Sequence, residues 1–555
     1  MSNANEFKGC RVTETLYNKD GAPYCNALFT PTNDEQRLAM FVHPRKVIPV
    51  VFLPGIMGSN LKFKTQPTLD SIQDDDLRVW RPDDTTFTLG ISTLDASERR
   101  RLFDPKNSEV DVRGDIDMDD IEDLTDAKQE TLDNWKNEYI RRGWGTVMFS
   151  SYGPILSKLE YQLNHIFYRG KVSDHWQDTI LKRKTLKNWG ELKGDKPLTE
   201  AELKKAANHW YPVWAVGYNW IRSNGEAGKY IAHWINVIID RYKKLGYDCE
   251  KVILVTHSMG GLAGRAACSP SFGKAENKVL GIVHGEQPAT GAGAAYKRCH
   301  AGFEGGWNPA TKASQQVLGS IGSEVTAVFS NSPGALQLLP SKLYGAGWLQ
   351  VQKPNRDVIL SLPKADPFTE IYNKRLAWWG LMNPQWLDPT PPEPVDTRPS
   401  IDALWTSYID NLDLAGLFHE NLGSYYHPHT HAHHGVDSNQ KAWGNVVWKL
   451  KKIDDSGDVA SYTSAGTYTR SGDGEISIKA LRPNAMKDYN TTVSIQPAEE
   501  VGDGTVPKRS ADAAANASKF SAAMTGYDHQ GSYQNEHVQA VTLYSIARLA
   551  LLSTL

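Results

Sequence analysis

KVILVTHSMG, residues 251–260, is the segment that most strongly indicates the architecture of this chain. After Lys251 it is a short aliphatic run, which is typical of a strand buried on both faces of a parallel sheet. A sharp turn with Ser258 at its tip then leads into small residues at 260–264, which predict a helix start packed close to the strand. Such a nucleophile elbow also uses the helix N-terminus, which favours negative charge on a reacting oxygen. Because ordinary βα units contain the same letters by chance, the assignment depends on partners elsewhere in the chain.

Two later segments supply the partners that an activated serine needs, a base and an acid that orients it. Asp503 lies in the glycine-flanked segment EVGDGTVP, residues 500–507, after an expected core strand at 491–496. His529 follows another expected strand, residues 520–526, and precedes a helix expected at about 535–552. The chain order Ser258, Asp503, His529 is that of α/β-hydrolases.

An oxyanion hole is expected beside this triad. The buried strand VIPVVFL, residues 47–53, leads directly into PGIMGSN, residues 54–60, whose glycines let backbone N–H groups face an open site. We expect the donors to be the backbone N–H of Met259 and that of Ile56 or Met57.

Two of the roles have competitors. His537 is an alternative base, but it lies on the expected final helix and not in the loop before it. Glu286 is an alternative acid, because it follows the expected strand at 279–284. Asp503 is preferred because it is closer to the usual place of the acid.

Two consecutive βα units, at 211–245 and 251–268, predict parallel strands with right-handed crossovers. The fold class is therefore α/β, an α/β-hydrolase fold with a mostly parallel central sheet flanked by helices and with large lid or cap insertions. The expected division of the chain is an N-terminal arm at 1–46, a core at 47–300 and 490–555 with an acidic insertion at about 65–140, and a lid at 301–489. Within the lid, RLAWWGLM at 375–382 is either a lipid-facing element or packed on the core.

Composition excludes several classes of protein. With 61 basic and 64 acidic residues, the net charge of −3 gives no attraction to nucleic acid. Five cysteines without C-x-x-C spacing argue against a disulfide scaffold or a zinc ribbon. The first residues lack the basic-then-apolar build of a signal peptide, so we expect a protein that is made in the cytoplasm without one.

Two segments raise the question of a metal. The histidines of YHPHTHAHH, residues 426–434, alternate in a way that could hold zinc. The acidic run at 115–126 resembles the start of a calcium loop, but its sixth position is Asp120, where an EF-hand needs glycine. We expect no metal site and no required cofactor, with calcium as the weaker alternative.

The motifs at 54–59 (P-G-x-x-G-S) and 502–506 (G-D-G-T-V) resemble those of serine lipases related to lecithin-cholesterol acyltransferase and to the deacylase of glycosylphosphatidylinositol anchors. A finer resemblance, carried by 284–298, 331–340 and 528–533, is to type VI secretion lipase effectors of the G-x-S-x-G group. It implies an antibacterial phospholipase that a type VI system delivers into the periplasm of target cells. It also implies three partners: membrane phospholipid, a cognate immunity protein and a component of the secretion apparatus. Thr256 departs from the family pattern, which has glycine there.

The resulting hypothesis is a serine lipid esterase of the phospholipase A type. In it Ser258 attacks the acyl carbonyl, His529 moves the proton, Asp503 orients the imidazole and water releases the fatty acid. Acyl transfer or general carboxylesterase activity by the same triad remains an alternative. A catalytically dead binding protein on a hydrolase fold is another.

Overall fold

The computed structural model describes most of the chain. The residues described are 10–13, 15–25, 37–40, 42–64, 77–119, 121, 129–168, 170–304, 317–389, 399–453, 459–464, 467–480 and 489–555. All statements below concern these residues.

A seven-stranded sheet forms the centre of the molecule. Its strands, in spatial order, are β12 (Glu191–Lys193), β26 (Phe520–Met524), β19 (Thr430–Gly435), β16 (Val279–Gly285), β15 (Val252–His257), β6 (Val50–Leu53) and β14 (Val213–Ala215). All neighbours pair in parallel except the edge strand β12, which is antiparallel to β26. The expected α/β class with a mostly parallel central sheet is confirmed.

Helices cover both faces of this sheet. In β6, Val51 and Leu53 face a core that also contains the apolar side of α6 (Asn224–Lys244) and α7 (Gly260–Cys268). Val50 and Phe52 alternate with them and face a second core with α4 (Phe149–Asn164) and α14 (Glu536–Ala550). Because strand side chains alternate between faces, an entirely apolar strand serves two cores at once.

The remaining helices of the described residues are α1 (Thr85–Ser92), α2 (Ala96–Leu102), α3 (Gln129–Arg141), α5 (Glu200–Ala206), α8 (Gly293–Ala301), α10 (Gly322–Phe329), α11 (Pro333–Leu336), α12 (Ile401–Leu422) and α13 (Lys508–Ala517). The smaller sheets comprise β7 (Leu61–Phe63) with β8 (Arg78–Trp80) and β9 (Ser108–Val110), and the pairs β1 (Cys10–Thr13) with β4 (Arg37–Met40), β2 (Leu16–Tyr17) with β3 (Pro23–Tyr24), β5 (Lys46–Val47) with β13 (His209–Trp210), β10 (Phe167–Tyr168) with β11 (Lys171–Val172), and β20 (Asp437–Ala442) with β25 (Glu500–Gly502).

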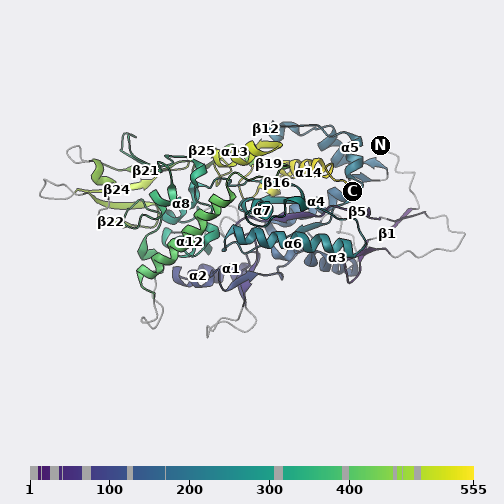
Figure 1. The fold of residues 1–555 in the computed structure, drawn as a ribbon, viewed down its shortest axis with the longest axis horizontal. Helices are drawn as coiled ribbons and strands as arrows, with labels where there is room; N and C mark the ends of the chain where they lie inside the picture. The colour runs from purple at the N-terminus through teal and green to yellow at the C-terminus, as the bar shows by residue number, and fades with distance from the viewer. Residues whose placement is uncertain are drawn as a thin grey trace.

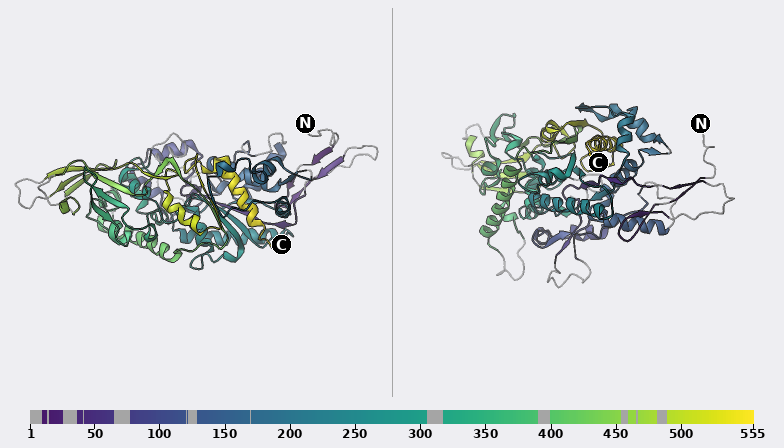
Figure 2. Two further views of the ribbon diagram at one scale, coloured as in Figure 1. Left: turned by 90° about the horizontal axis from the view of Figure 1, so that it is seen from above. Right: turned by 45° about the vertical axis from the view of Figure 1, so that its right-hand side comes forward.

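A second sheet lies at the left-hand end of the molecule in Figure 1, away from β1 and from the C-terminus. Its strands, in spatial order, are β18 (Val358–Leu362), β17 (Leu349–Gln352), β21 (Val446–Leu450), β24 (Tyr489–Ile495), β23 (Glu475–Ala480) and β22 (Thr467–Arg470). In both views of Figure 2 the purple N-terminal strands project from the side of the molecule away from this sheet.

Two strands differ from the sequence prediction. The segment at 491–496, expected as a core strand before Asp503, belongs to β24 of the second sheet. The His-rich segment, inside the range expected to be lid, forms β19 in the middle of the central sheet. The division of the chain into arm, core and lid otherwise remains a prediction.

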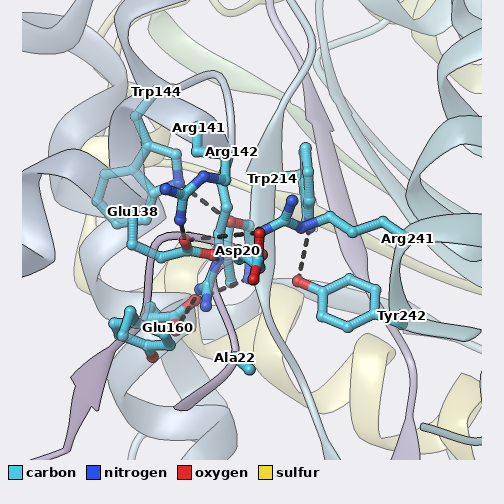
Figure 3. A network of polar contacts seen from close by, with 12 residues as sticks. Asp20, Ala22, Glu138, Arg141, Arg142, Trp144, Glu160, Trp214, Arg241 and Tyr242 are labelled. Carbon is cyan, nitrogen blue, oxygen red and sulfur yellow. Dashed lines mark hydrogen bonds and ion pairs between the residues drawn. The ribbon is translucent and has the colours of Figure 1, made fainter. Parts of the chain in front are cut away.

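Residues 15–25 of the predicted arm are fastened to the core by a buried polar network (Figure 3). Arg142 donates from Nε to Glu138 Oε1 at 2.9 Å and from Nη1 to Glu160 Oε1 at 2.8 Å. Its guanidinium also lies over the ring of Tyr17 at 5.3 Å. Nearby, Arg241 donates to the carbonyl oxygen of Asp20 at 2.7 Å. Charged groups of the core therefore contact the arm at Tyr17 and Asp20.

Candidate active site

Ser258 stands at the turn between β15 and α7. Its backbone has φ 52°, the left-handed conformation that costs energy for any residue with a Cβ. The Ser258 N–H donates to the carbonyl of Gly285 on the neighbouring strand at 2.9 Å, which fixes the turn. Gly260 is required beside it, because a Cβ there would lie 2.5 Å from the carbonyl oxygens of Leu53 and Pro54. The local sequence thus holds a strained serine at the carboxyl edge of the sheet.

Thr256, the departure from the family pattern, is accommodated by its neighbours. Its Oγ1 lies 2.9 Å from Nδ1 of His284 on the adjacent strand. Its methyl group faces Gly264 of α7, where a Cβ would lie 3.1 Å from Thr256 Cγ2. The helix can therefore approach the strand because the missing side chain is at 264 and not at 256.

Ser258, His529 and Asp503 form a continuous hydrogen-bonded chain. His529 Nε2 lies 2.8 Å from Ser258 Oγ, and its Nδ1 lies 2.6 Å from Asp503 Oδ2. Since a carboxylate accepts, the proton belongs on Nδ1, and Nε2 is free to accept from the serine hydroxyl. The other oxygen of Asp503 accepts the backbone N–H groups of Thr505 at 2.9 Å and Val506 at 2.7 Å.

Burial and mutual attraction set the charges of Asp503 and His529. For Asp503, burial works against the carboxylate, but the positive charge of His529 and its hydrogen bond outweigh burial and lower the pKa. For His529, burial disfavours the imidazolium, but the Asp503 carboxylate outweighs burial and raises the pKa above its ordinary value. The arrangement therefore stabilises a proton taken up by His529.

Asp503 reaches this position by a long excursion of the chain. After β19 the chain forms β20, passes through strands of the second sheet, and returns as β25, which pairs antiparallel with β20. Asp503 follows β25 directly. The acid therefore lies beyond the end of the central strand β19, although Gly435 and Asp503 are 68 positions apart in the sequence.

The residues predicted for the oxyanion hole are near Ser258. Ile56 and Met57 line the same cavity as Ser258, and Met57 has φ 62°. Met259 lies at the N-cap position of α7, with its side chain fully buried. A helix start and a glycine-rich loop thus meet at the serine, as electrostatic stabilisation of an oxyanion requires.

Neither competing residue contacts Ser258. His537 lies on α14, where its Nε2 is 2.9 Å from the side-chain amide nitrogen of Asn188. Glu286 is fully buried behind Asp503, and its carboxyl group accepts the Tyr527 hydroxyl at 2.9 Å and the Gly435 N–H at 2.8 Å. Burial, and then the negative charge of Asp503, raise the pKa of Glu286. Burial and the neighbouring carboxylate therefore favour the neutral form of Glu286, which contacts the end of β19 and Tyr527 and not the serine.

A cavity of about 440 Å³ opens in front of Ser258. Its lining is mainly apolar and includes Ile56, Met57, Pro288, Ala292, Ala294, Ala295, Phe303, Phe329 and Leu338. Arg298, Glu304 and Asp528 add charge to the lining. The cavity therefore combines a mostly apolar wall with a few charged groups beside Ser258, the usual composition of a small-molecule site.

The segments examined for metals do not form a ligand cluster among the residues that the structure describes. His431 and His433 alternate along β19 with their side chains buried in the core. The acidic run falls partly outside the described residues, since 120 and 122–128 are not among them.

Sequence reasoning missed two residues that join the parts of the site, His257 and Tyr152. His257 occupies the variable position before the serine in the motif, where no pattern assigns it a role. Tyr152 lies on α4, far from every motif in the sequence. Its partners could be found only from the fold.

In the part of the chain that the structure describes, no helix has the length and apolar character needed to cross a bilayer.

Comparison with known proteins places the chain in a family. No family model matches it, and no curated protein matches it. Among solved structures it is similar to a chain described under the words "The crystal structure of Tle4-Tli4 complex", with 30% sequence identity and a TM-score of 0.72. The match covers 91% of this chain and 98% of that chain. The chain therefore belongs to the Tle4 family of type VI secretion lipase effectors.

Proposed function

We propose that this chain is a serine lipid esterase of the phospholipase A type, with an α/β-hydrolase core. The observation that carries the proposal is the Ser258–His529–Asp503 chain of hydrogen bonds, at 2.8 Å and 2.6 Å, beside a mainly apolar cavity. Family membership supports the same reading, because the relatives are lipase effectors.

In the proposed reaction the Ser258 hydroxyl attacks the acyl carbonyl of a membrane phospholipid, and Nε2 of His529 takes the proton. Asp503 keeps Nδ1 protonated and stabilises the imidazolium. Backbone N–H groups of Met259 and of Ile56 or Met57 stabilise the oxyanion of the tetrahedral intermediate. His529 then protonates the leaving lysolipid oxygen, and water, activated by the same histidine, releases the fatty acid. No cofactor enters these steps.

The cavity lining suggests where the acyl chain lies. Phe303, Phe329 and Leu338 come from the part of the chain beyond residue 300, which we propose forms the lid together with the second sheet. The core contributes Ile56 and Met57 to the same lining. An acyl chain between these groups would place its ester carbonyl at the serine.

The biological setting is also part of the proposal. The similar solved structure is of a complex, Tle4-Tli4, and we propose by analogy that this chain has a cognate immunity partner. We propose delivery by a type VI apparatus into the periplasm of target bacteria, where membrane phospholipid is accessible.

The test is mass spectrometry of phosphatidylethanolamine and phosphatidylglycerol vesicles incubated with the protein. We expect wild type to release free fatty acid and lysolipid, with the same yield in a chelator, and Ser258→Ala to release neither. His537→Ala should retain the activity that His529→Ala loses. Lipid cleavage by Ser258→Ala would contradict the proposal, and acylated acceptors in place of free fatty acid would assign the triad to acyl transfer.

A further inference from the structure

His257, the residue immediately before Ser258, is buried between two segments of the site. Its side chain is only 2% exposed, and both ring nitrogens have partners. Nε2 lies 2.9 Å from the carbonyl oxygen of His529, and Nδ1 lies 2.9 Å from the Tyr152 hydroxyl. The Tyr152 oxygen in turn accepts the backbone N–H of Gly55 at 3.1 Å.

The chemistry of these groups allows one arrangement of protons. A carbonyl oxygen only accepts, so Nε2 of His257 must carry the proton and donate to His529. Nδ1 of the neutral ring then accepts, and the Tyr152 O–H donates to it. The chain therefore runs from Gly55 N–H to Tyr152, from Tyr152 O–H to His257, and from His257 N–H to the His529 carbonyl.

The surroundings of His257 and Tyr152 favour the protonation states that these hydrogen bonds require. Burial, and then the positive charge of His529, lower the pKa of His257 to about 3, so the ring stays neutral. Burial raises the pKa of Tyr152, so its hydroxyl keeps the proton that it donates. The titratable side chains that face His257 are Tyr152, His529, Asp503, His433 and Tyr533.

Packing is tight where the loop of residues 54–60 approaches His257 and Tyr152. A Cβ at Gly55 would lie 3.0 Å from Ser258 Cβ and 3.2 Å from His257 Nδ1. A Cβ at Gly58 would lie 2.8 Å from the Tyr152 ring. The loop can therefore approach the histidine and the tyrosine this closely only with glycine at 55 and 58, and the bond from the Gly55 N–H to Tyr152 ties it to this pair.

The loop that carries His529 is also held through the backbone N–H of this residue. The His529 N–H donates to the carbonyl of Asp503 at 2.8 Å, while the His529 carbonyl accepts from His257. Both backbone polar groups of His529 are thus fixed, one by the acid loop and one by the serine turn.

We propose that His257 is a positioning residue. Together with Tyr152, it fixes two loops relative to Ser258: the oxyanion loop (residues 54–60) at Gly55, and the base loop, which carries His529. The inference rests on the proposed serine esterase function. It assigns a task to the variable position of the motif: three loops far apart in sequence meet at this one imidazole. Neither His257 nor Tyr152 takes part in the chemical steps themselves.

The test compares Tyr152→Phe with Tyr533→Phe in the full chain. Tyr533 is a matched control because it is equally buried and packs its ring against His257, but its hydroxyl donates to the carbonyl of Thr256 at 3.0 Å and not to the loop chain. We expect Tyr152→Phe to lower kcat by about 10- to 100-fold, the size of effect seen when reacting groups are slightly misplaced, with little change in KM. Affinity for an alkyl boronic acid, which mimics the tetrahedral intermediate, should fall by the same factor. Tyr533→Phe should change neither.

A second pair of variants separates hydrogen bonding from packing. His257→Gln retains a donor and an acceptor and should keep kcat within about 5-fold of wild type, whereas His257→Phe retains only the ring and should lose at least as much as Tyr152→Phe. Ring ¹⁵N shifts assigned by difference with His257→Gln should show the proton on Nε2.

Equal losses in Tyr152→Phe and Tyr533→Phe, equal losses in the two His257 variants, or a proton on Nδ1 would each overturn the positioning role. If His257→Phe does not fold, the tyrosine pair alone decides. Failure of the underlying function gives a different result, because Ser258→Ala would then remain active.

Discussion

At the scale of single residues, His529 is the group whose charge controls the proposed reaction. Only its neutral form accepts the serine proton, and the Asp503 carboxylate at 2.6 Å raises its pKa. A raised pKa means that the imidazole takes up a proton at a higher pH than usual. The acidic limb of the rate profile should therefore lie above the ordinary histidine pKa of about 6.5.

The raised pKa of His529 gives a prediction for Asp503→Asn. Without the carboxylate, the pKa of His529 should fall, so the acidic limb of kcat/KM should move to lower pH. The rate on the plateau should drop by about 10⁴-fold, because the amide no longer favours the Nδ1–H tautomer. The measurement is kcat/KM on a soluble ester between pH 4 and pH 9.

Glu286→Gln is the matched control for that variant. Burial, and then the negative charge of Asp503, raise the pKa of Glu286, which favours its neutral form, and the amide preserves the shape of that form. We expect a loss of less than about 10-fold and an unchanged acidic limb. A loss in Glu286→Gln as large as that in Asp503→Asn would show that Glu286, and not Asp503, orients the base.

At the scale of secondary structure elements, the elbow depends on how closely α7 approaches β6. The carbonyl oxygens of Leu53 and Pro54 lie 2.5 Å from where a Cβ of residue 260 would be, and backbone atoms cannot move aside as a flexible side chain can. Gly264 similarly leaves room for the methyl group of Thr256. Small residues in α7 therefore determine the position of Ser258.

Gly260→Ala should accordingly lower the free energy of unfolding by about 1–3 kcal/mol and reduce activity with it, as overpacking does. Gly90→Ala is the control, because nothing lies within 4 Å of a Cβ there and the residue is inside α1. It should raise stability by about 0.5–1 kcal/mol and leave activity unchanged. Urea unfolding and ester hydrolysis measure both effects, and an active, fully stable Gly260→Ala would contradict the close approach.

The elements also show why some of the fold could be predicted from the sequence. The apolar runs of β6, β15 and β16 are buried on both faces, and continuous hydrophobicity identifies such strands. β19 is equally buried, but its histidines are polar, so the sequence does not identify it as a core strand. Their burial depends on neighbours such as Glu286 and Thr542 that only the fold provides. β24 alternates buried and partly exposed residues, the pattern of a sheet with one face in solvent, and its apolar members suggested a core strand.

The sequence likewise indicated some residues of the candidate site and not others. Ser258, Asp503 and His529 each stand in a motif with glycine or turn residues, and the structure brings the three together. His257 and Tyr152 carry no such mark, because their hydrogen bonds link segments 97 to 272 positions apart in the sequence.

At the scale of the whole molecule, the arm is anchored through a fully buried cation. Arg142 has no exposed surface and is shared by Glu138 and Glu160, which are also buried (Figure 3). Removing one partner of such a group leaves uncompensated charge in the interior. Surface pairs such as Arg45 with Asp248 have no comparable effect, because water solvates both ends.

Arg142→Met should therefore lower the free energy of unfolding by about 3–5 kcal/mol, because two buried carboxylates lose their cation. Arg45→Ala should change it by less than about 1 kcal/mol. Urea midpoints with unchanged slopes are the measurement. Proteolysis should also cut residues 15–25 faster in Arg142→Met than in Arg45→Ala, and equal midpoints for the two variants would contradict the anchoring role.

The central claim, that His529 and Asp503 activate Ser258 for attack on an acyl ester, is tested most directly by an alkyl fluorophosphonate followed by intact mass and peptide mapping. We expect one adduct on Ser258 in wild type and His537→Ala, none in Ser258→Ala, and very slow labelling in His529→Ala. An adduct on another residue, or undiminished labelling in His529→Ala, would contradict it.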